Sequence, residues 1–142
     1  MDIGLKGFME ECRANIAEVR GGTKEKQEKV DFWNACIVLC DGLITYAHRM
    51  ADEAERQAAE CSDDKRRAEL LAIAENCRVV PENPPQTFHQ ALQMVWFIQV
   101  AFHIEAPTTA CGFGRFDQYM YPFYKADLEA GRNTKEEMLE ML

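Results

Sequence analysis

The sequence predicts a mainly α-helical chain, and three observations carry that prediction. Apolar residues recur every three to four positions through most of the 142 residues. Glycines and prolines lie between these periodic segments, where helices would end. Hydrophobic residues make up 47%, enough for a real core. Helices are expected at about 3–19, 24–61, 63–77, 88–105 and 116–130, and another begins at 135.

The first two expected helices differ greatly in length. Helix 3–19 has an apolar stripe and ends at Arg20-Gly21-Gly22. Helix 24–61, with Thr23 as its N-cap, would span ~55 Å, which exceeds what a compact domain of this size needs. Gly42 costs it ~1 kcal/mol relative to alanine, so a close helix neighbour is expected there. Its polar end, 52–60, is expected to project beyond the core.

The next two helices are separated by prolines. Ser62 is expected to cap helix 63–77, and the prolines of 79–85 prevent a helix there. Thr87 and Gln90 form a capping box that opens helix 88–105. That helix is apolar around its whole circumference and is therefore expected to be buried on every side, more than the other helices can easily cover.

The C-terminal part predicts two further helices. Residues 116–130 are expected to form a helix interrupted at Pro122. Thr134 and Glu137 form a second capping box, opening a helix at 135 that runs only to Leu142. So short a helix is marginal without packing, and truncation of a longer chain is its simplest explanation.

The segment from Glu105 to Tyr124 is the one around which the chain is organised. Its glycines and aromatics suggest backbone led through a protein interior, where polar groups need partners. Arg115 and Asp117 would either contact a substrate or form a structural ion pair, and the pair is favoured. Gly112 and Gly114 would either cradle a phosphate or permit close backbone packing, and packing is favoured.

Composition narrows the class of protein. The net charge of −8 and the lack of a basic patch argue against nucleic-acid binding. The apolar run 91–104 is too short to span a membrane, so we expect a soluble protein. Cys36 and Cys40 share a helix face but lack a second pair of metal ligands, so reduced thiols, no metal site and a cytoplasmic location are expected.

Several motifs occur at fixed places along the chain. They are PPQTFHQALQ at 84–93, Trp96-Phe97, Glu105, GRFDQY at 114–119 and YPFY at 121–124. Together they resemble the pyruvate formate-lyase-like glycyl radical enzymes. The resemblance is strongest to their dehydratase and lyase branch, which includes glycerol, propanediol and hydroxyproline dehydratases and choline lyase. It covers nearly the whole chain, from Gly4-Leu5-Lys6-Gly7 onward.

The resemblance implies a large α/β barrel, of which this chain would supply part of the helical outer layer. In the family, one loop carries a cysteine that becomes a thiyl radical. Another loop carries a glycyl radical, installed by an S-adenosylmethionine-dependent iron–sulfur activating enzyme. Members act on small polar substrates by hydrogen abstraction followed by elimination or bond cleavage. The intact parent is expected to be a homo-oligomer whose partners are its substrate and that activating enzyme.

This chain departs from the family pattern because neither reactive loop is present. Cys111 and the glycines at 112 and 114 lie on the wrong motifs, so no catalytic residue and no cofactor are expected within residues 1–142. The chain is interpreted as an N-terminal-half fragment of a lyase or dehydratase that cleaves C–O, C–N, C–C or C–S bonds. Its loop 106–115 would lead toward the active site.

Two positions on that loop are expected to face substrate. Glycerol and propanediol dehydratases carry a His-Ser pair there that binds substrate hydroxyls, and the matching residues are Thr109 and Ala110. A site built to bond a hydroxyl needs those polar groups, so glycerol and propanediol are disfavoured as substrates. Arg115, Asp117 and Gly114 are expected to be structural residues near the site.

Two other readings remain open on the residues alone. The chain is alternatively a stand-alone helical interaction domain without catalytic activity, which would bury the apolar helix 88–105 instead of leaving a large apolar patch. A helical metal-binding bundle would need converging Glu and His ligands. His48, His89 and His103 are scattered and are expected to be surface or satisfied core residues.

Overall fold

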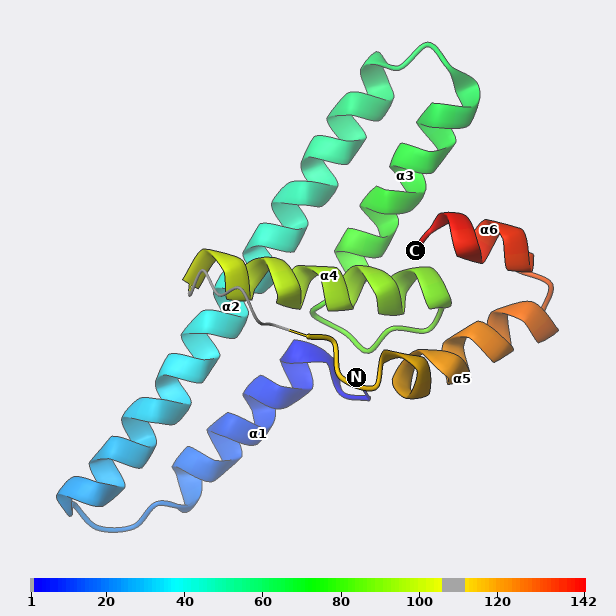
Figure 1. The fold of residues 1–142 in the computed structure, drawn as a ribbon. Helices are drawn as coiled ribbons and strands as arrows, with labels where there is room; N and C mark the ends of the chain where they lie inside the picture. Colours follow the sequence, from blue (N-terminus) through cyan, green and yellow to red (C-terminus); the bar gives the residue numbers. More distant parts are fainter. Residues whose placement is uncertain (1, 106–111) are drawn as a thin grey trace.

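The computed structural model describes residues 2–105 and 112–142. Within them the chain forms helices and turns without a strand, which confirms the predicted mainly α-helical fold class. The observed bounds differ from the expected ones by at most two residues. The helices are α1 Gly4–Glu18, α2 Lys24–Glu60, α3 Asp64–Val79, α4 Phe88–Glu105, α5 Phe116–Glu129 and α6 Lys135–Glu140 (Figure 1).

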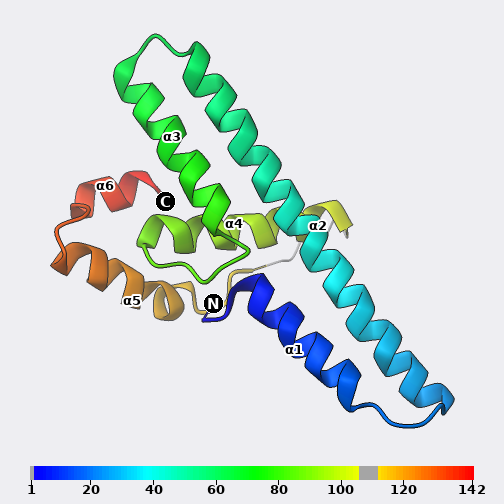
Figure 2. The same ribbon diagram turned by 180° about the vertical axis from the view of Figure 1, so that it is seen from behind.

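Helix α2 is the long spine of the fold. Helix α1 runs back along its first half and α3 along its second half, as both views show (Figures 1 and 2). Small side chains let α3 approach α2 closely, because Ala47, Ala51, Ala54 and Ala58 of α2 are all buried. The end of α2 at 52–60 therefore packs on α3, and the expectation that it projects beyond the core is wrong.

Helix α4 crosses the spine and joins two hydrophobic clusters. Phe97 enters the α2–α3 cluster and meets Tyr46 edge to face, with ring centroids 5.9 Å apart. At its other end, Phe88 and Ala91 pack against Met120 of α5 and Met138 of α6. Burial of these side chains helps to hold the C-terminal helices against α4.

Only one face of α4 is covered by the rest of the described chain. Phe88, Ala91, Met94 and Phe97 are buried, whereas the exposed residues of the same helix include large apolar ones. The expectation that α4 is buried on every side is therefore wrong for these residues, because its neighbours all lie along one side. The exposed fractions are 58% for Trp96, 51% for Phe102 and 68% for Ile104.

The start of α1 is tied to the proline-rich segment between α3 and α4. Leu5 N–H donates to the carbonyl of Pro81 at 2.9 Å, and Lys6 N–H donates to that of Glu82 at 2.9 Å. Gly4 permits this approach because its φ is +60° and a Cβ there would lie 2.5 Å from the Glu82 carbonyl oxygen. The Glu82 carboxylate also pairs with Lys6 at 3.5 Å and meets His48 of α2 at 3.4 Å.

The caps of three helices differ in how well the sequence predicted them. The capping box of Thr134 and Glu137 forms fully at α6. Helix α3 is capped by Asp63, whose carboxylate accepts from Arg66 N–H at 2.9 Å, so the expectation for Ser62 was wrong by one residue. Thr23 precedes α2 without a side-chain bond.

Two further expectations about helix interiors are also wrong. Helix α5 runs through Pro122 without interruption, because its aromatic residues pack against α4 and α6 and offset the lost backbone hydrogen bond. Gly42 has no described atom within 4 Å of a built Cβ, so no described helix closely approaches it.

Among the described residues, α2 is the helix whose length and composition would allow it to cross a membrane. This is weak evidence for a span, because core helices of soluble proteins meet the same two criteria.

Candidate functional site

The candidate site is the connection between α4 and α5, where the sequence predicts an approach to an active site. Thr109, Ala110 and Cys111 lie outside the described residues. The described part begins at Gly112 and leads into α5, whose first turn contains Asp117.

Arg115 and Asp117 form the expected ion pair. The Arg115 Nε donates to Asp117 Oδ1 at 3.3 Å and its Nη2 to Oδ2 at 3.2 Å. The hydrogen bond from Arg115 lowers the pKa of the Asp117 carboxyl. Both side chains are about 70% exposed among the described residues, at 70% and 71%. Their predicted place beside an active site stays a prediction.

Gly114 is required for its backbone conformation. Its φ is +61°, a region that side-chain-bearing residues rarely adopt. No described atom lies within 4 Å of a Cβ built at Gly114 or Gly112, so close packing of the described chain does not explain either glycine.

Aromatic side chains hold the described part of this connection against α5. The Tyr119 hydroxyl donates to the carbonyl of Phe113 at 3.0 Å. Phe116 contacts both residues, with ring centroids 5.9 Å from Phe113 and 5.6 Å from Tyr119. Burial raises the pKa of the Tyr119 phenol, which therefore stays protonated and can keep donating this bond.

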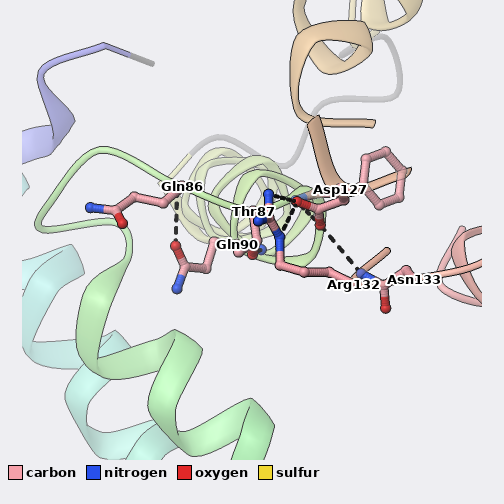
Figure 3. A network of polar contacts seen from close by, with 7 residues as sticks. Gln86, Thr87, Gln90, Asp127, Arg132 and Asn133 are labelled. Carbon is pink, nitrogen blue, oxygen red and sulfur yellow. Dashed lines mark hydrogen bonds and ion pairs between the residues drawn. The ribbon is translucent and has the colours of Figure 1, made fainter. Parts of the chain in front are cut away.

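The sequence reasoning missed Asp127, the polar residue that fixes how α4 and α5 lie together (Figure 3). This carboxylate of α5 is fully buried and accepts from the Phe88 backbone N–H of α4 at 2.9 Å. Arg132 donates to Oδ1 through Nε at 2.9 Å and Nη2 at 2.7 Å, and Asn133 donates to Oδ2 at 3.3 Å. We call these four residues the Asp127 clamp. Its only sequence signal is an acidic residue shortly before Gly131, followed by Arg and Asn.

The Asp127 clamp positions the candidate site from a distance. It satisfies an N–H group at the start of α4, one that the helix itself leaves unpaired. Because α4 and α5 run in opposite directions, the clamp joins the start of α4 to the end of α5 (Figures 1 and 3). The opposite ends of both helices carry the connection 106–115.

Near the clamp, the capping box predicted for Thr87 and Gln90 forms only in part. The Gln90 N–H donates to Thr87 Oγ1 at 3.2 Å. The Gln90 side chain accepts from the Gln86 N–H at 2.9 Å instead of from Thr87, one residue earlier than a capping box requires (Figure 3).

An apolar groove with a volume of about 480 Å³ borders the described part of the connection. His89 and Gln93 are its polar members, and burial lowers the pKa of His89, which favours a neutral imidazole. No three His, Cys, Asp or Glu side chains of the described residues are arranged to hold a metal ion. The remaining lining residues are Leu92, Val95, Trp96, Phe113, Phe116, Met141 and Leu142.

The model of the family described as pyruvate formate lyase-like matches residues 1–142. The chain belongs to the pyruvate formate lyase-like family. This agrees with the resemblance carried by the motifs between Pro84 and Tyr124. The family match extends beyond them to the whole chain, including helices α1 to α3.

Named relatives in the pyruvate formate lyase-like family agree with this assignment. The chain is 40% identical over 141 residues to isethionate sulfite-lyase of Bilophila wadsworthia, covering 98% of this chain and 17% of the relative. A structure titled for 1,2-propanediol dehydration in Roseburia inulinivorans matches with a TM-score of 0.94 and 42% identity, covering 98% of this chain and 17% of that one.

A second solved structure has the same fold over nearly the whole of this chain. The glycyl radical enzyme from Archaeoglobus fulgidus matches with a TM-score of 0.90 and 38% identity, over 97% of this chain and 18% of that one. The relatives are glycyl radical lyases and dehydratases, which supports that general kind of reaction. The chain spans less than a fifth of the length of these proteins.

Proposed function

We propose that residues 1–142 are part of a glycyl radical lyase or dehydratase. The intact enzyme would cleave a C–O, C–N, C–C or C–S bond of a small polar substrate by hydrogen abstraction and elimination. One observation carries the proposal: nearly the whole chain aligns with such enzymes at about 40% identity while spanning 17% of their length.

In this proposal the chain supplies scaffold and an approach to the substrate. The Asp127 clamp fixes α4 against α5, and the far ends of these helices hold the connection 106–115. Tyr119 and Phe116 keep the described part of that connection against α5. These contacts would position the connection without taking part in bond cleavage.

In this family a glycine stores the radical and a cysteine thiyl radical abstracts hydrogen from the substrate, and we place both groups outside residues 1–142. Gly112 and Gly114 belong to the segment that leads into α5 and not to the family's radical loop, so we assign neither as the radical site. We propose that an S-adenosylmethionine-dependent iron–sulfur activating enzyme is a partner of the intact protein.

We further propose that the substrate is neither glycerol nor propanediol. The positions that match the hydroxyl-binding His-Ser pair of those dehydratases are Thr109 and Ala110. Thr109 retains one hydroxyl, whereas Ala110 offers no side-chain donor or acceptor. If this is right, activated enzyme should turn over neither glycerol nor propanediol, and the double variant Thr109→His with Ala110→Ser should gain affinity for both.

The exposed apolar surface favours the hypothesis that the chain is part of a longer polypeptide over the hypothesis that it is a stand-alone interaction domain. Trp96, Phe102 and Ile104 of α4 are more than half exposed, where a self-sufficient domain would cover them. We expect the 142-residue chain to bind a hydrophobic dye. Trp96→Gln should lower that binding without lowering stability, whereas Phe97→Ala, which removes a side chain only 2% exposed, should destabilise the fold by about 3–5 kcal/mol.

The deciding experiment measures the size of the native product and tests whether it carries an organic radical after activation. An antibody against residues 1–142, with mass spectrometry, should detect a protein several times larger than 16.3 kDa in the source cells. Anaerobic treatment of that protein with its activating enzyme should produce an organic radical in electron paramagnetic resonance. A native product of 16.3 kDa would overturn the proposal, as would a long product that never carries a radical.

We propose a cytoplasmic location and a homo-oligomeric parent. The acidic net charge of −8 disfavours nucleic acid as a partner. Size-exclusion chromatography of the native product with light scattering would measure the oligomeric state.

A further inference from the structure

Trp96 lies where two apolar grooves meet on the exposed face of α4. The first is the groove of about 480 Å³ that borders the candidate site. The second, of about 260 Å³, lies between α2, α3 and α4, and Trp96 and Gln93 line both. Together they form an apolar track across α4, which we call the Trp96 track. In the second groove the other α4 residues are Phe97 and Val100. The facing residues are mostly apolar and include Tyr46, Met50, Leu70 and Ile73, together with the polar Glu53 and Gln57 of α2.

Helix α6 ends at one end of the Trp96 track. Met138 is buried at 1% exposure and anchors α6 to the cluster of α4 and α5. One turn further on, Met141 and Leu142 form part of the wall of the first groove. Both views place the end of the chain beside α4 and the lower part of α3, with α6 directed toward α3 (Figures 1 and 2).

We infer that α6 continues as a helix past Leu142 in the longer polypeptide and lies along the Trp96 track, covering Trp96. The inference rests on the proposed function, because it requires a longer chain such as the relatives have. About three further turns, roughly 16 Å, would take α6 past α4 toward the groove beside α3. Its apolar residues should recur at three- and four-residue intervals, continuing the series Met138, Met141 and Leu142.

This occupant fits the grooves better than a second copy of the chain. Met141 and Leu142 already supply one wall of the first groove, so the next residues of the same chain arrive there without a separate association step. A second copy would need that separate step and would have to fit beside Met141 and Leu142.

The test is site-specific photocrosslinking in the native-length protein. The photoreactive residue p-benzoylphenylalanine replaces Trp96, and mass spectrometry identifies the peptide joined to it. The matched control carries the same residue in place of Tyr121 of α5, which is equally exposed at 58% and lines neither groove. We expect position 96 to join the residues directly after Leu142 and position 121 not to.

Hydroxyl-radical footprinting supplies a second measurement that needs no substitution. Oxidation of Trp96 should be high in the 142-residue chain and fall sharply in the native-length protein, while oxidation of the buried Phe97 stays low in both. Crosslinking of position 96 to a distant segment or to a second copy would overturn the inference, and so would persistent oxidation of Trp96. In those cases the proposed function would still be tested by the native size and the radical assay, so the two proposals can fail independently. A native chain that ends at Leu142 would overturn both.

Discussion

Two acidic residues of the same helix show how far residue-level reasoning reaches. Asp117 and Asp127 both lie on α5 and both pair with an arginine. Asp117 could be singled out from the sequence because Arg115 and two glycines stand beside it, yet its pair is exposed. Asp127 is fully buried and accepts from another helix. Its role depends on a contact across 39 residues of sequence, which no local pattern reveals.

Replacing Asp127 should cost more than replacing any other acidic residue described on α5. In Asp127→Asn one acceptor oxygen becomes an NH2 donor, so the side chain can accept from Arg132 or from the Phe88 N–H but not from both, and Arg132 loses its charged partner. We expect a loss of about 3 kcal/mol in the free energy of unfolding. Urea denaturation of the 142-residue chain measures it. The control Asp117→Asn should leave the urea midpoint nearly unchanged, because its pair is exposed and screened by solvent. Equal midpoints for both variants would contradict this account.

Cys77 predicts how stability responds to alkaline pH. Burial between α2 and α3 raises the pKa of its thiol from 9.0 to about 11. Between these values the unfolded thiol ionises while the folded thiol stays protonated. Stability is therefore fully present below pH 9 and falls as the pH rises toward 11. Denaturation at a series of pH values should show this slope, and Cys77→Ala should make it shallower. An unchanged slope in that variant would count against burial as its cause.

At the scale of helices, the chain predicts where elements begin better than how they begin. The starts of the six described helices follow from apolar periodicity, breaker residues and residue types suited to capping, all of which are local. The N-cap is the last residue in a non-helical conformation before the helix, so a shift of the helix start by one residue passes the role to a neighbour. At α3 this residue is Asp63 and not Ser62. At α4 the Gln90 side chain accepts from the Gln86 N–H and not from Thr87. The full box forms at Thr134, because the side chain of the neighbouring Asn133 is bonded to Asp127.

The cap of α3 can be tested by a pair of adjacent substitutions. Asp63→Ala removes the acceptor for the Arg66 N–H and should cost about 1 kcal/mol of stability. Ser62→Ala should change stability little, because that hydroxyl makes no described cap bond. Thermal unfolding followed by circular dichroism compares the two. If Ser62→Ala proved the more damaging, the cap would lie one residue earlier than the structure has it.

At the scale of the whole molecule, the helical class and the family follow from the sequence, but the covered faces do not. Periodicity shows that α4 is apolar on every side, whereas burial depends on which elements lie against it. The described chain covers only one face and leaves Trp96 and Ile104 exposed. The candidate site is limited in the same way. The Arg115 and Asp117 pair forms as expected, while its exposure reflects the absence of any covering element among the described residues.

Gly42 gives a test of what covers α2 in the longer polypeptide. Its neighbours on the same face, Val38 and Leu39, are 71% and 54% exposed, and no described atom approaches a Cβ at Gly42. In the 142-residue chain Gly42→Ala should therefore stabilise the fold by up to about 1 kcal/mol, the helix propensity difference. In the native-length protein we expect the same substitution to destabilise, because a helix packed on this apolar face would meet the added methyl group. Thermal midpoints of Gly42→Ala and of the unsubstituted protein, measured for the 142-residue chain and for the native-length protein, give the sign of the stability change in each. Stabilisation in both proteins would show that α2 has no close neighbour at Gly42, and destabilisation of the short chain would contradict the open space around it.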